Sequence, residues 1–209
     1  AIKEQGATVV EHGRSHPERL ARAMEIQKET GAAFVHPFDD PKVIAGQGTI
    51  ALEILEDLPG VDTVLVPVGG GGLISGISLF MKGEREQTRV YGVQSDKAAS
   101  MYESLRAGRP ILLEDFHTIA DGLAPGEPGQ LTFRIVRENV SDVLLTSDER
   151  IRSATMIALE SLHMLIEPSG AAVIAALDDS YRPRRGENLV LVISGGNISL
   201  KLLRELLTT

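Results

Sequence analysis

The fold is decided by the stretch Thr63-Val64-Leu65-Val66-Pro67-Val68-Gly69-Gly70-Gly71-Gly72, which leads directly into the apolar residues 73–81. A nearly continuous apolar run of this length is typical of a strand that is buried on both faces of a parallel sheet. The four glycines mark a sharp turn, and the apolar residues after them predict a helix. This stretch therefore predicts one strand, one glycine loop and one helix of an α/β fold.

The same alternation continues on both sides of the glycine loop. Further strands are expected at residues 7–10, 33–35, 90–93, 143–145 and 189–193, and further helices at residues 48–58, 98–107, 131–139, 151–165, 171–177 and 200–207. Such alternation predicts a mostly parallel, twisted sheet flanked by helices, with right-handed crossovers. Ligands bind beyond the carboxyl ends of the strands in such sheets, where the clusters Gly69–Gly72 and Gly195–Gly196 fall.

Helix boundaries are expected where capping residues occur. Ser15 and Glu18 form a capping-box pattern at the start of a helix that Gly31 would end. Thr146, followed by a glutamate three residues later, and Ser169 are expected to cap two later helices. Residues 108–130 are rich in Gly and Pro and predict a long connection, and such connections are often functional.

The bulk composition excludes several classes of protein. The 209 residues carry a net charge of -8, which argues against a nucleic-acid-binding surface with clustered Lys and Arg. The absence of cysteine excludes disulfides, zinc–thiolate sites and cysteine nucleophiles. No apolar run approaches the ~18 residues of a membrane span and no signal peptide is visible, so a cytoplasmic location is expected. Residues 1–5 read as the end of a helix without an initiator Met, so we expect the natural protein to begin further upstream.

The glycines Gly69–Gly72 predict a site for an anion. Without Cβ atoms the backbone can turn several N–H groups toward one point, and the following helix start adds positive potential. The plain alternative is a tight turn, for which one or two glycines would suffice. The dinucleotide fingerprint fails in every register, and a nucleoside-triphosphate loop would need a lysine where Ile77 follows Gly76. A single phosphate monoester therefore fits best.

Several short motifs together resemble a known family. They are Asp40–Thr49 (DPKVIAGQGT), Pro67-Val68 before the glycines, Ile119–Gly122 (IADG), Ile166–Pro168 (IEP) and Ser194–Asn197 (SGGN). In this order and spacing, over almost the whole chain, they resemble the threonine dehydratase/serine racemase branch of the fold-type-II pyridoxal-phosphate enzymes. Gln94, the stretch 128–138 and an ending soon after Asn197 resemble the short catabolic threonine dehydratases.

The resemblance implies a partial tryptophan-synthase-β-like fold and a pyridoxal 5'-phosphate site. Residues 1–35 would be the end of the small domain, and residues 36–209 the large domain without its N-terminal strands. The cofactor phosphate would be bound by the amides of Gly69, Gly70, Gly71, Gly72 and Leu73. Ser194 would place its hydroxyl against the pyridine nitrogen. Asp121-Gly122 and Asn197 would line the pocket, and Glu167 would lie near the ring, unless it merely initiates the turn before Pro168.

Two departures from the family pattern matter. The family's Schiff-base lysine lies in a Ser-x-Lys-x-Arg-Gly segment and its ring-oxygen asparagine in a Ser-Gly-Asn-His segment, and neither segment occurs in this sequence. We therefore expect no catalytic residue on this chain, inactivity of the chain alone, and a missing N-terminal segment or second chain that supplies the lysine. The acidic positions of the racemases' cation site correspond to Gln94 and Ser100, with Ala98 offering only a carbonyl, so no metal is expected.

The implied function is the deamination of L-threonine or L-serine by β-elimination, which gives 2-oxobutyrate or pyruvate and ammonia. A homo-oligomer with a small amino-acid substrate is expected. Two alternatives stay open: a serine racemase, which the weak cation site disfavours, and a non-catalytic half-protein that binds a phosphate ligand.

Other candidate residues have plainer explanations. His163 is expected to pack within a helix, His36 to lie in a turn and His117 to lie at the surface. The pairs Asp39-Asp40 and Asp178-Asp179 resemble metal ligands but fall where aspartate caps backbone N–H groups. A solvated loop is the default interpretation of the basic residues Arg182, Arg184 and Arg185.

Overall fold

The computed structural model describes residues 2–13, 16–114 and 116–208, and the chain forms two compact units, Ala1–His36 and Pro37–Thr209. The first unit contains the short 3-10 helix η1 (Lys3–Gln5) and the helix α1 (His16–Thr30). Gly31 ends α1 as predicted, because its φ is +70° and its N–H donates to the Gln27 carbonyl at 2.8 Å. The predicted cap Ser15 lies outside the described residues.

The strands predicted at residues 7–10 and 33–35 are wrong. The described part of the first unit contains no strand, and residues 7–10 and 32–36 run without regular structure. Val10 is 52% and Val35 is 70% exposed, so neither segment packs on a sheet. β-branched residues favour strands only where a neighbouring strand and a packed face of a sheet are available. Residue composition alone therefore gave a wrong prediction.

The second unit is built on a parallel sheet, as predicted. Its four strands are β1 (Thr63–Pro67), β2 (Arg89–Ser95), β3 (Asp142–Thr146) and β4 (Leu189–Leu191). The order across the sheet is β3-β2-β1-β4, and all three neighbouring pairs are parallel. β1 therefore lies inside the sheet, where Val64 pairs with Val90 on one side and Val190 on the other.

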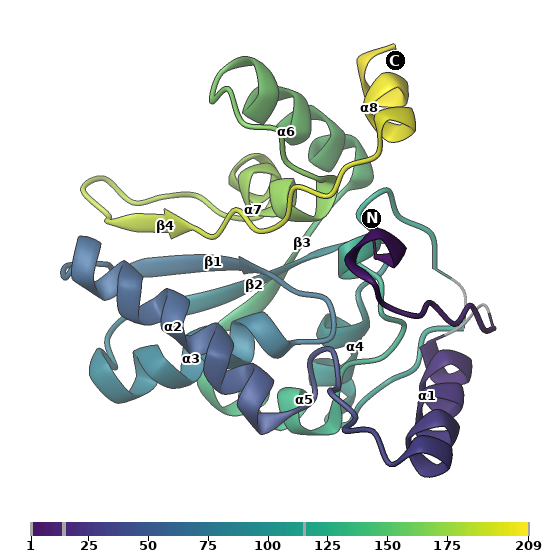
Figure 1. Cartoon of the computed structure of the whole chain (residues 1–209). Helices are drawn as coiled ribbons and strands as arrows, with labels where there is room; N and C mark the ends of the chain where they lie inside the picture. The colour runs from purple at the N-terminus through teal and green to yellow at the C-terminus, as the bar shows by residue number, and fades with distance from the viewer. Residues whose placement is uncertain (1, 14–15, 115, 209) are drawn as a thin grey trace. The chain divides into compact units, whose positions relative to one another are not determined.

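Helices cover both faces of this sheet (Figure 1). On one face lie α2 (Pro41–Asp57), α3 (Gly72–Glu84), α4 (Ser100–Ala107) and α5 (Gln130–Asn139), and on the other lie α6 (Asp148–Glu160) and α7 (Pro168–Asp179). A short helix η2 (Asp121–Leu123) lies in the long connection, and α8 (Leu200–Leu207) has the predicted bounds. The α/β class with helices on both faces is thus confirmed.

The strand β1 is buried throughout, as its apolar run predicted. Val64 and Val66 belong to the core cluster under α3 and α5, whereas Leu65 belongs to the cluster under α6 and α7. Each of these side chains has 0% exposure. Because alternate residues of a strand point to opposite faces, β1 joins the two cores and fixes the glycine loop at its carboxyl end.

Several helix starts differ from prediction because other residues provide the caps. α2 begins seven residues early, since the Asp40 carboxylate accepts the N–H groups of Lys42 (2.8 Å) and Val43 (3.1 Å). Ser147, not Thr146, caps α6 by accepting the Arg150 N–H at 3.3 Å. The predicted cap Ser169 instead lies in the first turn of α7, behind Glu167 at the N-cap position.

Two elements are shorter than predicted. α6 ends at Glu160, although the leucines at positions 162 and 165 continue its apolar spacing. These two leucines are exposed, so no packing favours a longer helix. His163 also adopts a positive φ of 54°, which a helix does not allow. His163 is therefore not a helical residue. β4 ends at Leu191, and beyond it the Val192 N–H still donates to the Leu65 carbonyl at 3.0 Å.

An ionic cluster binds the amino ends of the strands together. The Glu187 side chain is 2% exposed and pairs with the Arg89 guanidinium at 2.6 Å. It also accepts hydrogen bonds from the hydroxyls of Thr63 (2.6 Å) and Tyr181 (2.7 Å) and from the Arg184 N–H (2.8 Å). Burial raises the pKa of Glu187, but these hydrogen bonds and the Arg89 charge outweigh it and lower the pKa from 4.5 to about 2.

This cluster predicts acid sensitivity of the second unit. A carboxyl whose folded pKa is depressed contributes stability above its unfolded pKa and loses it as the pH falls toward the folded pKa. The Glu187 contribution should therefore be complete above pH 4.5 and fall progressively toward pH 2. Urea unfolding across this window should show that Glu187→Gln has a flatter pH dependence than the unaltered chain. Equal slopes for both proteins would contradict the assignment.

Candidate functional site

The glycine loop lies between the end of β1 and the first turn of α3. Gly71 is the N-cap of α3 and has a φ of +95°, a left-handed conformation that favours glycine. Within the described part of the chain, no protein acceptor bonds to the backbone N–H groups of Gly69 to Leu73. Backbone N–H groups in folded proteins are nearly always paired, so this row of donors is prepared for a ligand or water.

These donors line a pocket with a volume of about 230 Å³. The pocket is lined by Pro37, Phe38, Pro67, Gly69, Gly70, Gly71, Gly72, Leu73, Gly122, Leu123, Glu167, Ser169 and Ser194. It thus brings together eight of the ten residues predicted for the cofactor site, from segments up to 125 positions apart in the sequence. Asp121 and Asn197 are not among the lining residues. The Asn197 N–H donates to the Glu167 carboxylate at 3.0 Å.

Glu167 joins two segments of the pocket wall. Its backbone N–H donates to the Gly195 carbonyl at 3.2 Å, and its carboxylate accepts the Asn197 N–H. The same residue stands at the N-cap of α7, directly before Pro168. It therefore starts the helix and also fixes the Ser194–Asn197 turn against the pocket, so the two interpretations of this residue are compatible.

Two pocket residues carry no signal that the sequence analysis recognised. Ser169 is 4% exposed, and its hydroxyl accepts the Gly122 N–H at 2.9 Å, which joins η2 to α7. Its place next to Glu167-Pro168 could have indicated the pocket. Phe38 covers the loop so closely that a Cβ on Gly70 would lie 2.5 Å from its ring. Nothing in the sequence spacing connects residue 38 with residue 70.

The loop fits a phosphate group in shape and in charge. A Cβ on Gly69 would lie 2.5 Å from the Gly122 carbonyl oxygen, so this position of the loop has no room for a side chain. The N-terminus of α3 supplies partial positive charge from its unpaired N–H groups. A phosphate-sized anion would satisfy these donors, whereas a larger polyphosphate would need additional cations, and no Lys or Arg is among the described residues that line the pocket.

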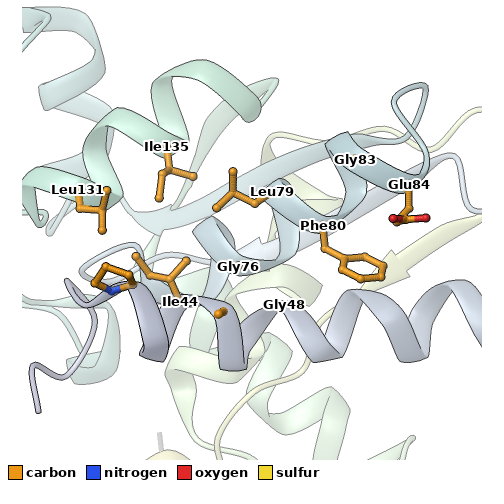
Figure 2. Close-up of a pocket in the computed structure, with 11 residues that line it drawn as sticks. Ile44, Gly48, Gly76, Leu79, Phe80, Gly83, Glu84, Leu131 and Ile135 are labelled. Atoms are coloured by element: carbon orange, nitrogen blue, oxygen red, sulfur yellow. The ribbon is translucent and has the colours of Figure 1, made fainter.

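A larger cavity of about 570 Å³ lies elsewhere, between α2, α3 and α5 (Figure 2). Ile44, Leu79, Leu131 and Ile135 point into it, and Glu84 is the only charged residue among the described residues that line it. None of the described residues that line it has a side chain that donates hydrogen bonds, since Glu84 is an acceptor when ionised. Size alone would favour it, but the chemistry of the walls favours the smaller pocket as the functional site.

Comparison with known proteins identifies the family. The model of the family "Pyridoxal-phosphate dependent enzyme" matches residues 1–195. The chain belongs to the pyridoxal-phosphate-dependent enzymes. The resemblance noted in the sequence is confirmed by relatives of this enzyme family that are named threonine ammonia-lyase or threonine dehydratase.

Three relatives illustrate the match within the pyridoxal-phosphate-dependent family. The L-threonine ammonia-lyase of Thermotoga maritima is 45% identical, with 97% of this chain and 50% of the relative covered. The catabolic L-threonine dehydratase TdcB of Escherichia coli K12 is 42% identical, with 99% and 63% covered. The structure of maize serine racemase is 36% identical with a TM-score of 0.90, and 98% and 63% are covered. The chain spans about half to two thirds of the length of these relatives.

Other positions that the sequence analysis considered as metal ligands form hydrogen bonds within the protein. Gln94 is fully buried, donates to the Val68 carbonyl at 3.2 Å and accepts the Tyr102 N–H at 3.0 Å. The Ser100 hydroxyl donates to the Pro125 carbonyl at 3.2 Å. Asp39 and Asp40 cap helices, as predicted for this pair, and Asp179 accepts from Thr146 and Ser147. None of the helices in the described part of the chain is both long and apolar enough to cross a membrane.

Proposed function

We propose that this chain is the phosphate-binding part of a pyridoxal-phosphate-dependent ammonia-lyase that deaminates L-threonine or L-serine by β-elimination. The observation that carries the proposal is the row of backbone N–H groups at residues 69–73, which have no acceptor among the described residues and lie in one pocket with Ser194 and Glu167. The names of the relatives support threonine as the substrate class. The small and large domains of such an enzyme would correspond to residues 1–35 and 36–209.

Each pocket residue receives a role in this proposal. The amides of Gly69 to Leu73 would bind the cofactor phosphate at the N-terminus of α3. Ser194 would place its hydroxyl at the pyridine nitrogen, and a hydroxyl, unlike a carboxylate, leaves that nitrogen largely unprotonated. Bound pyridoxal phosphate supplies the electron sink that stabilises negative charge at the substrate α-carbon. A moderated sink suits loss of a β-hydroxyl better than transamination.

Glu167 and Asn197 would act through the turn that holds Ser194. The Glu167 carboxylate accepts the Asn197 N–H and the Glu167 N–H donates to Gly195, so both contacts restrain residues 194–197. Gly122, held by the Ser169 hydroxyl, would form the opposite wall. No lysine is among the described residues that line the pocket. We propose that the reacting amine comes from a part of the longer protein beyond these 209 residues. The homo-oligomer and the cytoplasmic location stay predictions.

Turnover by the longer protein tests the proposal. Incubated with pyridoxal phosphate, the protein that contains this chain should convert L-threonine to 2-oxobutyrate and L-serine to pyruvate, each with one equivalent of ammonia. D-serine without pyruvate would instead indicate the racemase. Phosphate-ligand binding without any turnover would indicate the non-catalytic module. Either of these two results would overturn the ammonia-lyase assignment.

A further inference from the structure

The carbonyl of Gly70 is held by residues outside the pocket. It accepts the Thr132 hydroxyl at 2.6 Å and the Gly129 N–H at 3.3 Å, both from the start of α5. Thr132 has 0% exposure, and a Cβ on Gly71 would lie 2.9 Å from the Thr132 Cβ. The glycine loop therefore rests directly on the first turn of α5.

This contact determines where the next amide points. In a trans peptide the C=O of one residue and the N–H of the next lie on opposite sides of the same plane. Since the Gly70 carbonyl is fixed toward α5, the Gly71 N–H points away from α5. Gly71 is one of the pocket-lining residues whose amide has no acceptor in the described part of the chain. Thr132 thus orients a phosphate donor without touching the pocket.

The start of α5 is itself held by a residue that is distant in the sequence. The Asp39 carboxylate accepts the N–H groups of Gln130 (3.0 Å), Leu131 (2.9 Å) and Thr132 (3.0 Å). Gly129 precedes the helix without a side-chain cap, and a Cβ there would lie 2.1 Å from Asp39 Oδ1. A carboxylate at three helix N–H groups is a strong cap. Asp39 therefore substitutes for a local cap and holds Thr132 in place.

We propose that Thr132, supported by Asp39 through the first turn of α5, is a positioning residue that holds the glycine loop in its phosphate-binding conformation. The inference rests on the proposed function, because it assigns a role toward the same phosphate. It adds two residues that lie 62 and 31 positions from Gly70 in the sequence and do not line the pocket. The residue types carry no recognisable motif for this role.

The test measures ligand binding rather than turnover. Pyridoxine 5'-phosphate is the probe, since it has the phosphate but no aldehyde to react with surface lysines, and pyridoxine without phosphate is the reference. Thr132→Val keeps the shape of the side chain and removes the donor, so the 209-residue chain should bind the phosphorylated probe about five- to tenfold more weakly. Thr132→Ser restores the donor and should bind within about twofold of the unaltered chain.

A matched control comes from α6. Thr155 is 3% exposed and donates its hydroxyl to the Ile151 carbonyl at 2.8 Å, so Thr155→Val removes a comparable buried hydrogen bond away from the loop. This control should leave probe binding unchanged. If Thr132→Val does not fold, Asp39→Ala serves in its place and should weaken binding about two- to threefold, because it removes the acceptor of three N–H groups at the start of α5.

The outcomes separate the inference from the proposed function. Equal binding by Thr132→Val and the unaltered chain, equal loss in Thr132→Ser, or equal loss in the Thr155 control would each overturn the positioning role alone. Failure of the unaltered chain to prefer the phosphorylated probe over pyridoxine would overturn the phosphate site itself, and the inference with it.

Discussion

Gly76→Ala should destabilise the second unit by about 3 kcal/mol, a large effect for one added methyl group. A Cβ at this position would lie 2.3 Å from the Ile44 carbonyl oxygen and 2.6 Å from the Gly48 N, both backbone atoms of α2. Backbone atoms of a helix cannot move aside as a flexible side chain can. The methyl group would therefore push α2 away from α3. It would also displace the start of α3, which directly follows the glycine loop.

The control for this prediction lies in the partner helix. Gly46 is exposed in α2, and a Cβ there would meet nothing within 4 Å. Gly46→Ala should therefore stabilise the chain by roughly 0.5–1 kcal/mol, since alanine is the better helix former. Urea unfolding of both variants measures the two effects. If Gly76→Ala unfolded at the same urea concentration as the unaltered chain, the close packing of α2 on α3 would not contribute to stability as we expect.

The sequence predicted the centre of the fold better than its margins. The apolar run 63–68, the glycines and the helix after them appear as β1, the loop and α3 because each pattern reflects local burial and geometry. The segments 7–10 and 33–35 also contain residues that favour strands, but these segments have no sheet to join. Likewise α6 stops at Glu160 although its apolar spacing continues, because the following leucines are exposed. Burial is a property of the whole fold that a short window does not contain.

The candidate site likewise contains residues that sequence motifs predict and residues that only the structure reveals. Residues 69–73, 122, 167 and 194 belong to motifs of a known family and lie in one pocket. Phe38, Thr132 and Ser169 touch the loop or its walls through contacts that span 32, 62 and 47 positions of the chain. Ser169 lies next to the Glu167-Pro168 motif, which could have indicated it. The residue types of Phe38 and Thr132 are common in any core or helix start, so only the packing of α5 and of the segment before α2 against the loop reveals these two residues.

Gly71→Ala should weaken binding of pyridoxine 5'-phosphate by at least about tenfold, the largest effect expected on the site. The φ of Gly71 is +95°, which costs an L-residue about 1–2 kcal/mol. The added methyl group would also lie 2.7 Å from the Met101 Cε and 2.9 Å from the Thr132 Cβ. The methionine end can move but the threonine Cβ cannot, so the loop must shift and the Gly71 N–H must turn.

The variant Gly108→Ala separates the effect of backbone strain from the effect of the steric clash. Gly108 also has a positive φ, +70°, as the C-cap of α4, but a Cβ there would meet nothing within 4 Å. This control should lose stability through backbone strain while its probe affinity stays unchanged. If Gly71→Ala binds the probe as the unaltered chain does, phosphate binding does not depend on the left-handed conformation and close packing of Gly71. The run of amides at residues 69–73 would then be an ordinary turn, and the cofactor would have to be bound elsewhere.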